Sequence, residues 1–268
     1  MIIQLLLLVS LSVIGHGTST LQDYNTTLQH LEPMIAIVVG RLAKLGEIPY
    51  QVSLQRIKTQ HHFCGESIIN RIYVLTAAHC IKTKDIKDIS VNVGLIDLRK
   101  PHAVHLIKSS YIHQKYNRTN SWIHDIALLK LKTPLVFSFL VRPVTLPKQN
   151  QIIRAGSHAV VSGFGRLSFR GKRTNNLYIT DILITKQTTC QEIYNLTNRQ
   201  IYSTQICAND PTKLKGFCHG DSGGPLVVNG QLVGIVSWLY RGCGNPKYPQ
   251  IYTHVPSYVD WINEHSII

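Results

Sequence analysis

The run Gly220-Asp221-Ser222-Gly223-Gly224-Pro225 constrains this 268-residue chain more than any other segment. Ser222 has glycine close by on both sides, and glycine lacks the Cβ that stops other residues from turning tightly. Such a turn can point successive backbone N–H groups into one concavity. That concavity could hold the negative charge that develops on a substrate carbonyl, usually the largest single contribution to catalysis. The run alone is equally compatible with a simple glycine-rich turn.

Two further segments favour the catalytic interpretation. A histidine lies in Thr76-Ala77-Ala78-His79-Cys80, and an aspartate begins Asp125-Ile126-Ala127-Leu128-Leu129. The order His79, Asp125, Ser222 separates trypsin- and chymotrypsin-like enzymes from subtilisins and α/β-hydrolases. The chain resembles the trypsin/chymotrypsin-like serine protease family, in its arthropod-like form with three disulfides.

The resemblance covers roughly residues 37–268, which is everything except the N-terminal leader. Five further motifs follow in family order with near-family spacing: Ile37-Val38-Val39-Gly40, Pro49-Tyr50-Gln51-Val52-Ser53-Leu54, Gly163-Phe164-Gly165, Val236-Ser237-Trp238 and Tyr252-Thr253-His254-Val255. The family fold implied is all-β, with two six-stranded antiparallel β-barrels and a C-terminal helix.

The hydrophobic pattern independently favours many short antiparallel strands, because apolar residues alternate in short runs bounded by turn residues. These runs are Gln51–Gln55, Tyr73–Thr76, Ala127–Leu131, Ala159–Ser162, Leu226–Val228 and Leu232–Trp238. The one strong helical pattern is Tyr258–Ile262. We expect the chain to change barrel near residues 142–150, where Pro143 and Pro147 interrupt strand pairing.

The N-terminus predicts secretion. Leu5–Ile14 is apolar but too short to span a bilayer, so we assign residues 1–17 to a signal peptide and residues 18–36 to a propeptide. Residues 37–268 form the peptidase domain, and no later segment has the length of a membrane span. The glycosylation sequons, which agree with an extracellular protein, are at Asn25, Asn117 and Asn195.

Six cysteines suit an oxidising compartment and allow 15 pairings. The family resemblance implies the pairs Cys64–Cys80, Cys190–Cys207 and Cys218–Cys243. No Cys-x2-Cys pair suggests zinc. The segment that corresponds to the calcium loop of trypsins, Gly94–His105, has Asp97 as its only carboxylate, too few hard oxygens for calcium. We therefore expect no metal and no cofactor.

The resemblance also implies the catalytic roles. Ser222 attacks the scissile carbonyl, His79 acts as general base and then general acid, and Asp125 orients the imidazole. The N–H groups of Gly220 and Ser222 form the oxyanion hole. The backbone of Ser237, Trp238 and Leu239 pairs with the substrate as an edge strand.

Activation is expected to differ from that of ordinary trypsins. In the family, Asp221 receives the new α-amino group that zymogen cleavage releases, and here Ile37 is the matching N-terminus. The preceding residue is Ala36, and no lysine or arginine occurs from Met1 to Ala36. The activator must prefer a small apolar residue, or the protein is never activated in this way.

The pocket for the residue before the scissile bond (S1, which receives P1) also departs from trypsin. Gly216 stands where trypsin has its aspartate, and Phe217 stands where the family has a small residue. Leu239 and Gln250 replace two glycines of the pocket wall. This pattern predicts an elastase-like enzyme that cleaves after alanine or valine. The alternative is a closed pocket, and then a catalytically silent decoy or binding protein.

Charge leaves the partners partly open. The chain has 28 basic and 14 acidic residues, a net charge of +14. The lysines and arginines are scattered, which favours a soluble basic surface over a weak polyanion contact. We expect a monomer that meets protein or peptide substrates and protease inhibitors.

Overall fold

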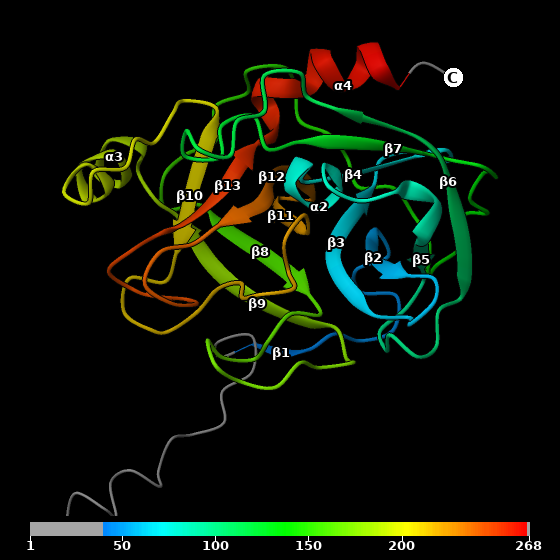
Figure 1. The fold of residues 1–268 in the computed structure, drawn as a ribbon. Coiled ribbons are helices and arrows are strands. Elements are labelled where there is room, and N and C mark those ends of the chain that lie inside the picture. Colours follow the sequence, from blue (N-terminus) through cyan, green and yellow to red (C-terminus); the bar gives the residue numbers. More distant parts are fainter. Residues whose placement is uncertain (1–39, 267–268) are drawn as a thin grey trace, which may run out of the picture. The chain divides into compact units, whose positions relative to one another are not determined.

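The computed structural model describes residues 40–266. Within them, the first of two barrels closes in the strand order β2-β3-β4-β7-β6-β5, and every pairing is antiparallel (Figure 1). Its strands are β2 (Gln51–Arg56), β3 (His62–Ile68), β4 (Tyr73–Thr76), β5 (Ile89–Val93), β6 (Ala103–Ile112) and β7 (Ala127–Leu131).

The second barrel is also six-stranded and antiparallel. The ring runs β8-β9-β10-β13-β12-β11 and returns to β8, and the short strand β1 is added at β9. The strands are β1 (Arg41–Leu42), β8 (His158–Gly163), β9 (Tyr178–Ile184), β10 (Gln205–Asn209), β11 (Pro225–Val228), β12 (Gln231–Trp238) and β13 (Gln250–His254). The all-β, double-barrel prediction is confirmed.

Alternation of side chains builds each core. In β2, Val52 and Leu54 point into the first barrel, while the alternating polar residues Gln51, Ser53 and Gln55 lie on the other face of the strand. A second cluster, which includes Val161, Leu226 and Tyr252, fills the second barrel. The chain passes from one barrel to the other between Val144 and Thr145. Val144 N donates to Ile68 O of the first barrel, and Thr145 O accepts from Leu232 N of the second.

The described helices are short: α2 (Ala78–Ile81), α3 (Gln187–Asn195) and α4 (Val259–His265), with 3₁₀ turns at Ile86–Asp88 and Val255–Tyr258. The predicted terminal helix is present as α4. Helix α3 was not predicted, because only Cys190 and Tyr194 on it are buried and no side chain caps its N-terminus. None of the helices within residues 40–266 is long and apolar enough to cross a membrane.

The disulfides of the structure join Cys64 to Cys80, Cys190 to Cys207 and Cys218 to Cys243. These are the pairs that the family resemblance implied, and no cysteine remains free. The bonds close segments of 16, 17 and 25 residues. Each contributes about 3 kcal/mol in the loop-entropy model, because it restricts the unfolded chain.

Glu66 is a buried acid inside the first barrel. It lies on β3, opposite Val52 in the register, and its side chain is fully buried. Within residues 40–266 neither carboxyl oxygen has a hydrogen-bond partner, and burial raises the pKa of Glu66 well above its ordinary value. The chain therefore carries an acid that resists ionisation in the folded state, and this reduces stability.

We expect Glu66→Met to raise the free energy of unfolding at pH 7 by about 1–2 kcal/mol, since an unsatisfied buried polar group is removed. The unfolded state releases the proton of Glu66 more readily than the folded state. The stability cost of Glu66 therefore grows as pH rises above the unfolded pKa. Urea denaturation at pH 5.5 and pH 8 should show a larger gain at pH 8. The exposed Glu192→Met serves as control, and an unchanged or lower stability of Glu66→Met would contradict the prediction.

Candidate active site

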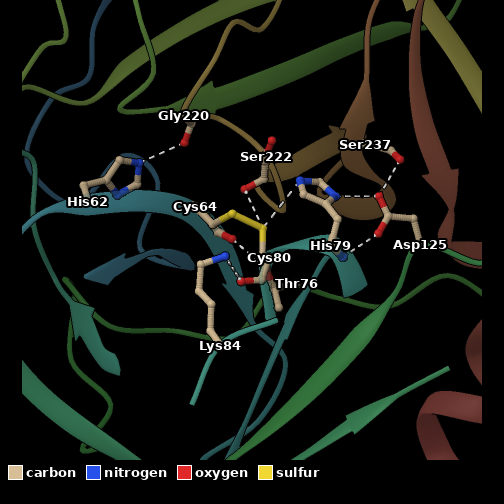
Figure 2. Close-up of a disulfide and its surroundings, with 11 residues drawn as sticks. His62, Cys64, Thr76, His79, Cys80, Lys84, Asp125, Gly220, Ser222 and Ser237 are labelled. Atoms are coloured by element: carbon tan, nitrogen blue, oxygen red, sulfur yellow. Dashed lines mark hydrogen bonds and ion pairs between the residues drawn. A yellow bond between two sulfur atoms is a disulfide. The ribbon is translucent and has the colours of Figure 1, made fainter. Parts of the chain in front are cut away.

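His79 and Asp125 form the best-defined contact of the site. Strand β4 leads into α2, which carries His79, and Asp125 lies two residues before the start of β7. Asp125 Oδ2 lies 2.7 Å from His79 Nδ1, and Asp125 Oδ1 accepts from His79 N at 2.9 Å. Because a carboxylate only accepts, Nδ1 carries the proton and Nε2 keeps a lone pair. Figure 2 shows this ring edge facing the Ser222 segment.

The second barrel holds Asp125 in place. Ser237 Oγ donates to Asp125 Oδ2 at 2.6 Å, and Thr253 Oγ1 donates to Asp125 O at 2.7 Å. The carboxylate is fully buried, and the bonds from Ser237 Oγ and from the His79 backbone and ring compensate its lost hydration, while Thr253 holds the backbone carbonyl. Thr253 has a role at the site that the sequence patterns did not reveal, because its contact crosses 128 residues of chain.

Ser222 lies beside His79 (Figure 2), and its backbone ties it to the first barrel, since Gly65 N donates to Ser222 O at 2.7 Å. The side chain makes no hydrogen bond within residues 40–266, including none to His79. His79 Nε2 instead contacts Cys80 Sγ at 3.8 Å. The structure therefore brings the three predicted segments together and leaves the hydroxyl of Ser222 free to turn.

The turn around Ser222 requires glycine on both sides. Gly220 has φ +106° and Gly223 has φ +80°, both in the left-handed region. A Cβ on Gly223 would lie 2.2 Å from Thr76 Oγ1. Within residues 40–266 the N–H groups of Gly220 and Ser222 donate to no acceptor. Two adjacent, unused donors are what a developing oxyanion needs.

His62 supports this turn from the first barrel. His62 Nε2 donates to Gly220 O at 2.9 Å, and His62 Nδ1 accepts from Ser53 Oγ at 2.8 Å. Burial lowers the pKa of His62 to about 4, so the ring is neutral in this position. His62 was not predicted from the sequence, because its contact with Gly220 spans 158 residues of chain.

Asp221 is a buried carboxylate whose donors within residues 40–266 are two backbone N–H groups. Gly165 N donates to it at 2.7 Å and Cys218 N at 2.8 Å. Burial raises the pKa of Asp221 to about 6, and these two donors oppose the shift. A Cβ on Gly163 would lie 2.1 Å from Asp221 Oδ1, which explains the glycine there. The expected partner Ile37, with Ala36, lies outside the described residues.

The residues predicted to form the S1 pocket do meet. Gln250 Oε1 accepts from Phe217 N at 2.8 Å, and Gln250 Nε2 donates to Phe217 O at 2.6 Å. A Cβ on Gly216 would lie 1.8 Å from Gln250 Oε1, so the amide fills the space beside that glycine. Leu239 packs against the Cys218–Cys243 disulfide. The Gln250 amide is therefore fixed beside Gly216 by two hydrogen bonds to the Phe217 backbone.

Trp122 forms another wall that the sequence analysis missed. Its ring lies 5.1 Å from the His79 ring in edge contact. Ser121, Trp122 and His124 all have positive φ, between +48° and +59°, which is uncommon for such residues. The loop is fastened to the second barrel: Tyr202 Oη donates to Asn120 Oδ1 at 2.6 Å, and Gln205 Nε2 donates to Ser121 O at 2.7 Å.

The structure also describes the positions considered for a metal ion. The one cluster of metal-binding residue types in the described chain is Cys64, His79 and Cys80, and its two sulfurs form a disulfide. A disulfide offers no thiolate to a metal. The Asp97 carboxylate is paired with Arg99.

Two of the predicted sequons lie within the described chain. Asn117 and Asn195 are both exposed. Asn25 lies outside the described residues.

Two barrels, a buried Asp125 that holds the half-buried His79, and a serine turn whose two N–H groups have no acceptor within residues 40–266 are the features of a double-barrel serine hydrolase. A family model described as Trypsin matches residues 37–262. Two insect proteins are similar to the chain: chymotrypsin-2 of Vespa crabro and trypsin epsilon of Drosophila erecta. The first is 40% identical over 236 residues, 86% of this chain and 100% of the relative. The second is 38% identical over 227 residues, 84% of this chain and 86% of the relative.

The fold has solved counterparts as well. The structure of neuropsin, a serine protease expressed in mouse brain, superposes with a TM-score of 0.78 at 32% identity, covering 85% of this chain and 99% of that one. The chain belongs to the trypsin family, and it is a serine endopeptidase.

Proposed function

We propose that this endopeptidase is secreted as a zymogen and cleaves after small apolar residues through Ser222, His79 and Asp125. The observation that carries the proposal is the His79–Asp125 contact of 2.7 Å beside a serine whose turn offers two unused N–H groups. The apolar leader and three disulfides support secretion.

In the proposed reaction, Ser222 turns about χ1 so that Oγ donates to His79 Nε2. Oγ attacks the scissile carbonyl as its proton passes to Nε2, and Asp125 stabilises the imidazolium without taking the proton. The carbonyl oxygen becomes an oxyanion that accepts from the N–H groups of Gly220 and Ser222. His79 then protonates the leaving amine, and a water molecule activated by His79 releases the acyl group.

Activation is proposed to give the Asp221 carboxylate a positively charged partner. Its buried carboxylate has two backbone donors and no cation within residues 40–266. The α-amino group of Ile37, released by cleavage after Ala36, would supply the missing positive charge. Because a buried unpaired carboxylate is costly, this ion pair would stabilise the turn that ends in Ser222.

Specificity follows from the closed base of the S1 region. The Gln250 amide and the Phe217 ring are almost fully buried, and the amide occupies the space beside Gly216, so we expect room for a small P1 side chain only. Ala36 matches this preference, so the enzyme should process its own zymogen. Protease inhibitors as partners, a monomeric state and a weak polyanion contact belong to the same proposal, and the net charge of +14 supports the last of these.

The second candidate is a silent protease-fold binding protein. Two observations favour it: the double hydrogen bond that closes the S1 base, and the lack of a bond between Ser222 Oγ and His79 in the described structure. Catalytic hydrogen bonds often form only when substrate binds. The His79–Asp125 hydrogen bond is already formed, and it therefore favours the active endopeptidase over the silent binding protein.

A fluorophosphonate probe separates the two candidates. Protein cut between Ala36 and Ile37 should be labelled at Ser222, and a peptide library should show cleavage after alanine or valine. The Ser222→Ala zymogen should take no label and should stay uncut at Ala36 in pure solution. Processed protein that takes no label would support the silent alternative, and equal processing of Ser222→Ala would exclude self-activation.

A further inference from the structure

A polar cavity of about 430 Å³ lies next to the proposed catalytic residues. Its walls include Arg118 and Trp122 from the first barrel, and Arg199 and Trp238 from the second. Trp122 contacts the His79 ring, and Trp238 follows Ser237, which donates to Asp125. The cavity is therefore adjacent to the His79–Asp125 pair: Trp122 separates it from His79, and Ser237 separates Trp238 from Asp125.

The cavity lies where substrate residues before the scissile bond would pass. P1 faces Phe217 and Leu239, so the edge strand that continues along Ser237–Leu239 pairs with the residues that precede P1. The His79 ring is 5.1 Å from the Trp122 ring, and the Arg118 guanidinium is 5.0 Å from that ring. An extended peptide advances ~3.3 Å per residue, so Arg118 lies about two to three residues before P1.

Both arginines are exposed and lack an acidic partner. None of the ion pairs within residues 40–266 includes Arg118 or Arg199. Arg118 lies over the Trp122 ring, and Arg199 lies 4.2 Å over the Tyr240 ring. Stacking uses the face of a guanidinium and leaves its edge of N–H donors available. One N–H of Arg199 donates to Thr197 O at 3.1 Å, and the guanidinium also interacts with the Tyr240 hydroxyl, whereas no carboxylate of the described chain pairs with it.

Contacts within the protein fix the positions of the cavity walls, so they do not depend on a bound ligand. Tyr202 and Gln205 fasten the Asn120–Ser121 backbone to the second barrel. Trp238 in turn packs edge-on against the buried Tyr194 ring at 5.2 Å. Fixed walls that present two unpaired guanidinium groups suit a carboxylate, which accepts two N–H donors at once.

We propose that this cavity is a subsite for an acidic side chain, aspartate or glutamate, at P3 or P4 of the substrate. The inference rests on the proposed function and extends it, because it sets a second specificity requirement beside the small P1 residue. The net charge of +14 also favours encounter with acidic peptides.

The test compares peptides with alanine at P1 and with glutamate, glutamine or lysine in turn at P2, P3 and P4. For the activated enzyme, kcat/KM should be about tenfold higher for glutamate than for glutamine at P3 or P4, and lowest for lysine. The preference should shrink between 50 mM and 500 mM salt, because the arginines are exposed. The same peptides should bind the Ser222→Ala protein with the same order of Kd.

Two variants assign the preference to the cavity. Arg118→Gln/Arg199→Gln should bring the glutamate-to-glutamine ratio to about one. Arg118→Glu/Arg199→Glu should reverse the order so that lysine is preferred. The control Arg154→Gln/Arg170→Gln removes the same charge from exposed positions outside the cavity and should keep the wild-type ratio.

The outcomes separate this inference from the proposed function. Peptides cleaved at equal rates whatever the residue at P2–P4 would overturn the acidic subsite and leave the protease intact. Equal loss of preference in the cavity variant and the control would also overturn it, since general charge attraction would explain the effect. Preferential binding of acidic peptides to Ser222→Ala, without cleavage by the wild type, would support the subsite and overturn the proposed function.

Discussion

Gln250→Gly should change the preferred P1 residue from alanine to phenylalanine or leucine. Its amide now bonds to both backbone groups of Phe217 and fills the space beside Gly216. Its removal opens room for a large apolar side chain, and burying the additional carbon atoms is worth about 2–3 kcal/mol. The ratio of kcat/KM for phenylalanine over alanine at P1 should therefore rise about 100-fold.

The measurement is a P1 series of otherwise identical peptides, with Gln250→Gly/Phe217→Ser as a second variant that enlarges the pocket further. The double variant should show the larger shift, since Phe217 also narrows the region. The exposed Gln114→Gly provides a matched control. An unchanged P1 preference in both pocket variants would mean that Gln250 does not limit P1.

Acid should destabilise the fold through His62. Burial lowers the pKa of His62 to about 4, whereas an unfolded histidine has a pKa of about 6.5. Between these values the unfolded state binds more protons than the folded state, so stability is full above pH 6.5 and falls toward pH 4. The shift of about 2.5 units corresponds to about 3 kcal/mol for this fully buried ring.

His62→Gln isolates this contribution. At pH 7 the variant should be about 1–2 kcal/mol less stable, because Gly220 O and Ser53 Oγ lose their partner. As pH falls to 4 the wild type loses stability that the variant does not lose, so the two free energies should converge and cross. Glu66 and Asp221, whose pKa values are raised, act in the opposite direction but are common to both proteins.

Urea denaturation at pH 7, 5.5 and 4, with Ser222→Ala in both proteins to prevent self-cleavage, measures the difference. If the difference in free energy of unfolding between the two proteins is the same at all three pH values, the stability does not depend on protonation of His62. Because His62 holds the carbonyl of Gly220, the same protonation should loosen the oxyanion turn and lower kcat below pH 5.

Much of the fold was accessible from the sequence, because regular alternation reports a strand with one buried face. The runs at 51–55, 73–76, 127–131 and 232–238 all lie within strands of the structure. Strand β3 was not predicted, because Gly65 and Glu66 interrupt its apolar pattern. The cysteine pairs required the family resemblance, since the residues alone left every pairing open.

The site was predictable only where a local motif marks it. Short motifs surround His79, Asp125 and Ser222, and the replaced glycines pointed to Leu239 and Gln250. The sequence could not show that the Gln250 amide turns onto the Phe217 backbone. His62 and Trp122 were missed for a related reason, since a contact across 158 residues, such as His62 to Gly220, leaves no local pattern.

The loop of residues 117–124 is positioned by contacts with both barrels. It leaves the first barrel, yet Tyr202 and Gln205 of the second barrel hold its backbone, and Ser237 holds the aspartate that follows it. The halves are therefore not interchangeable modules. A chimera that joins this first barrel to a relative's second barrel would have to inherit the loop from the relative. Otherwise Asp125 would lose the supports that aim it at His79.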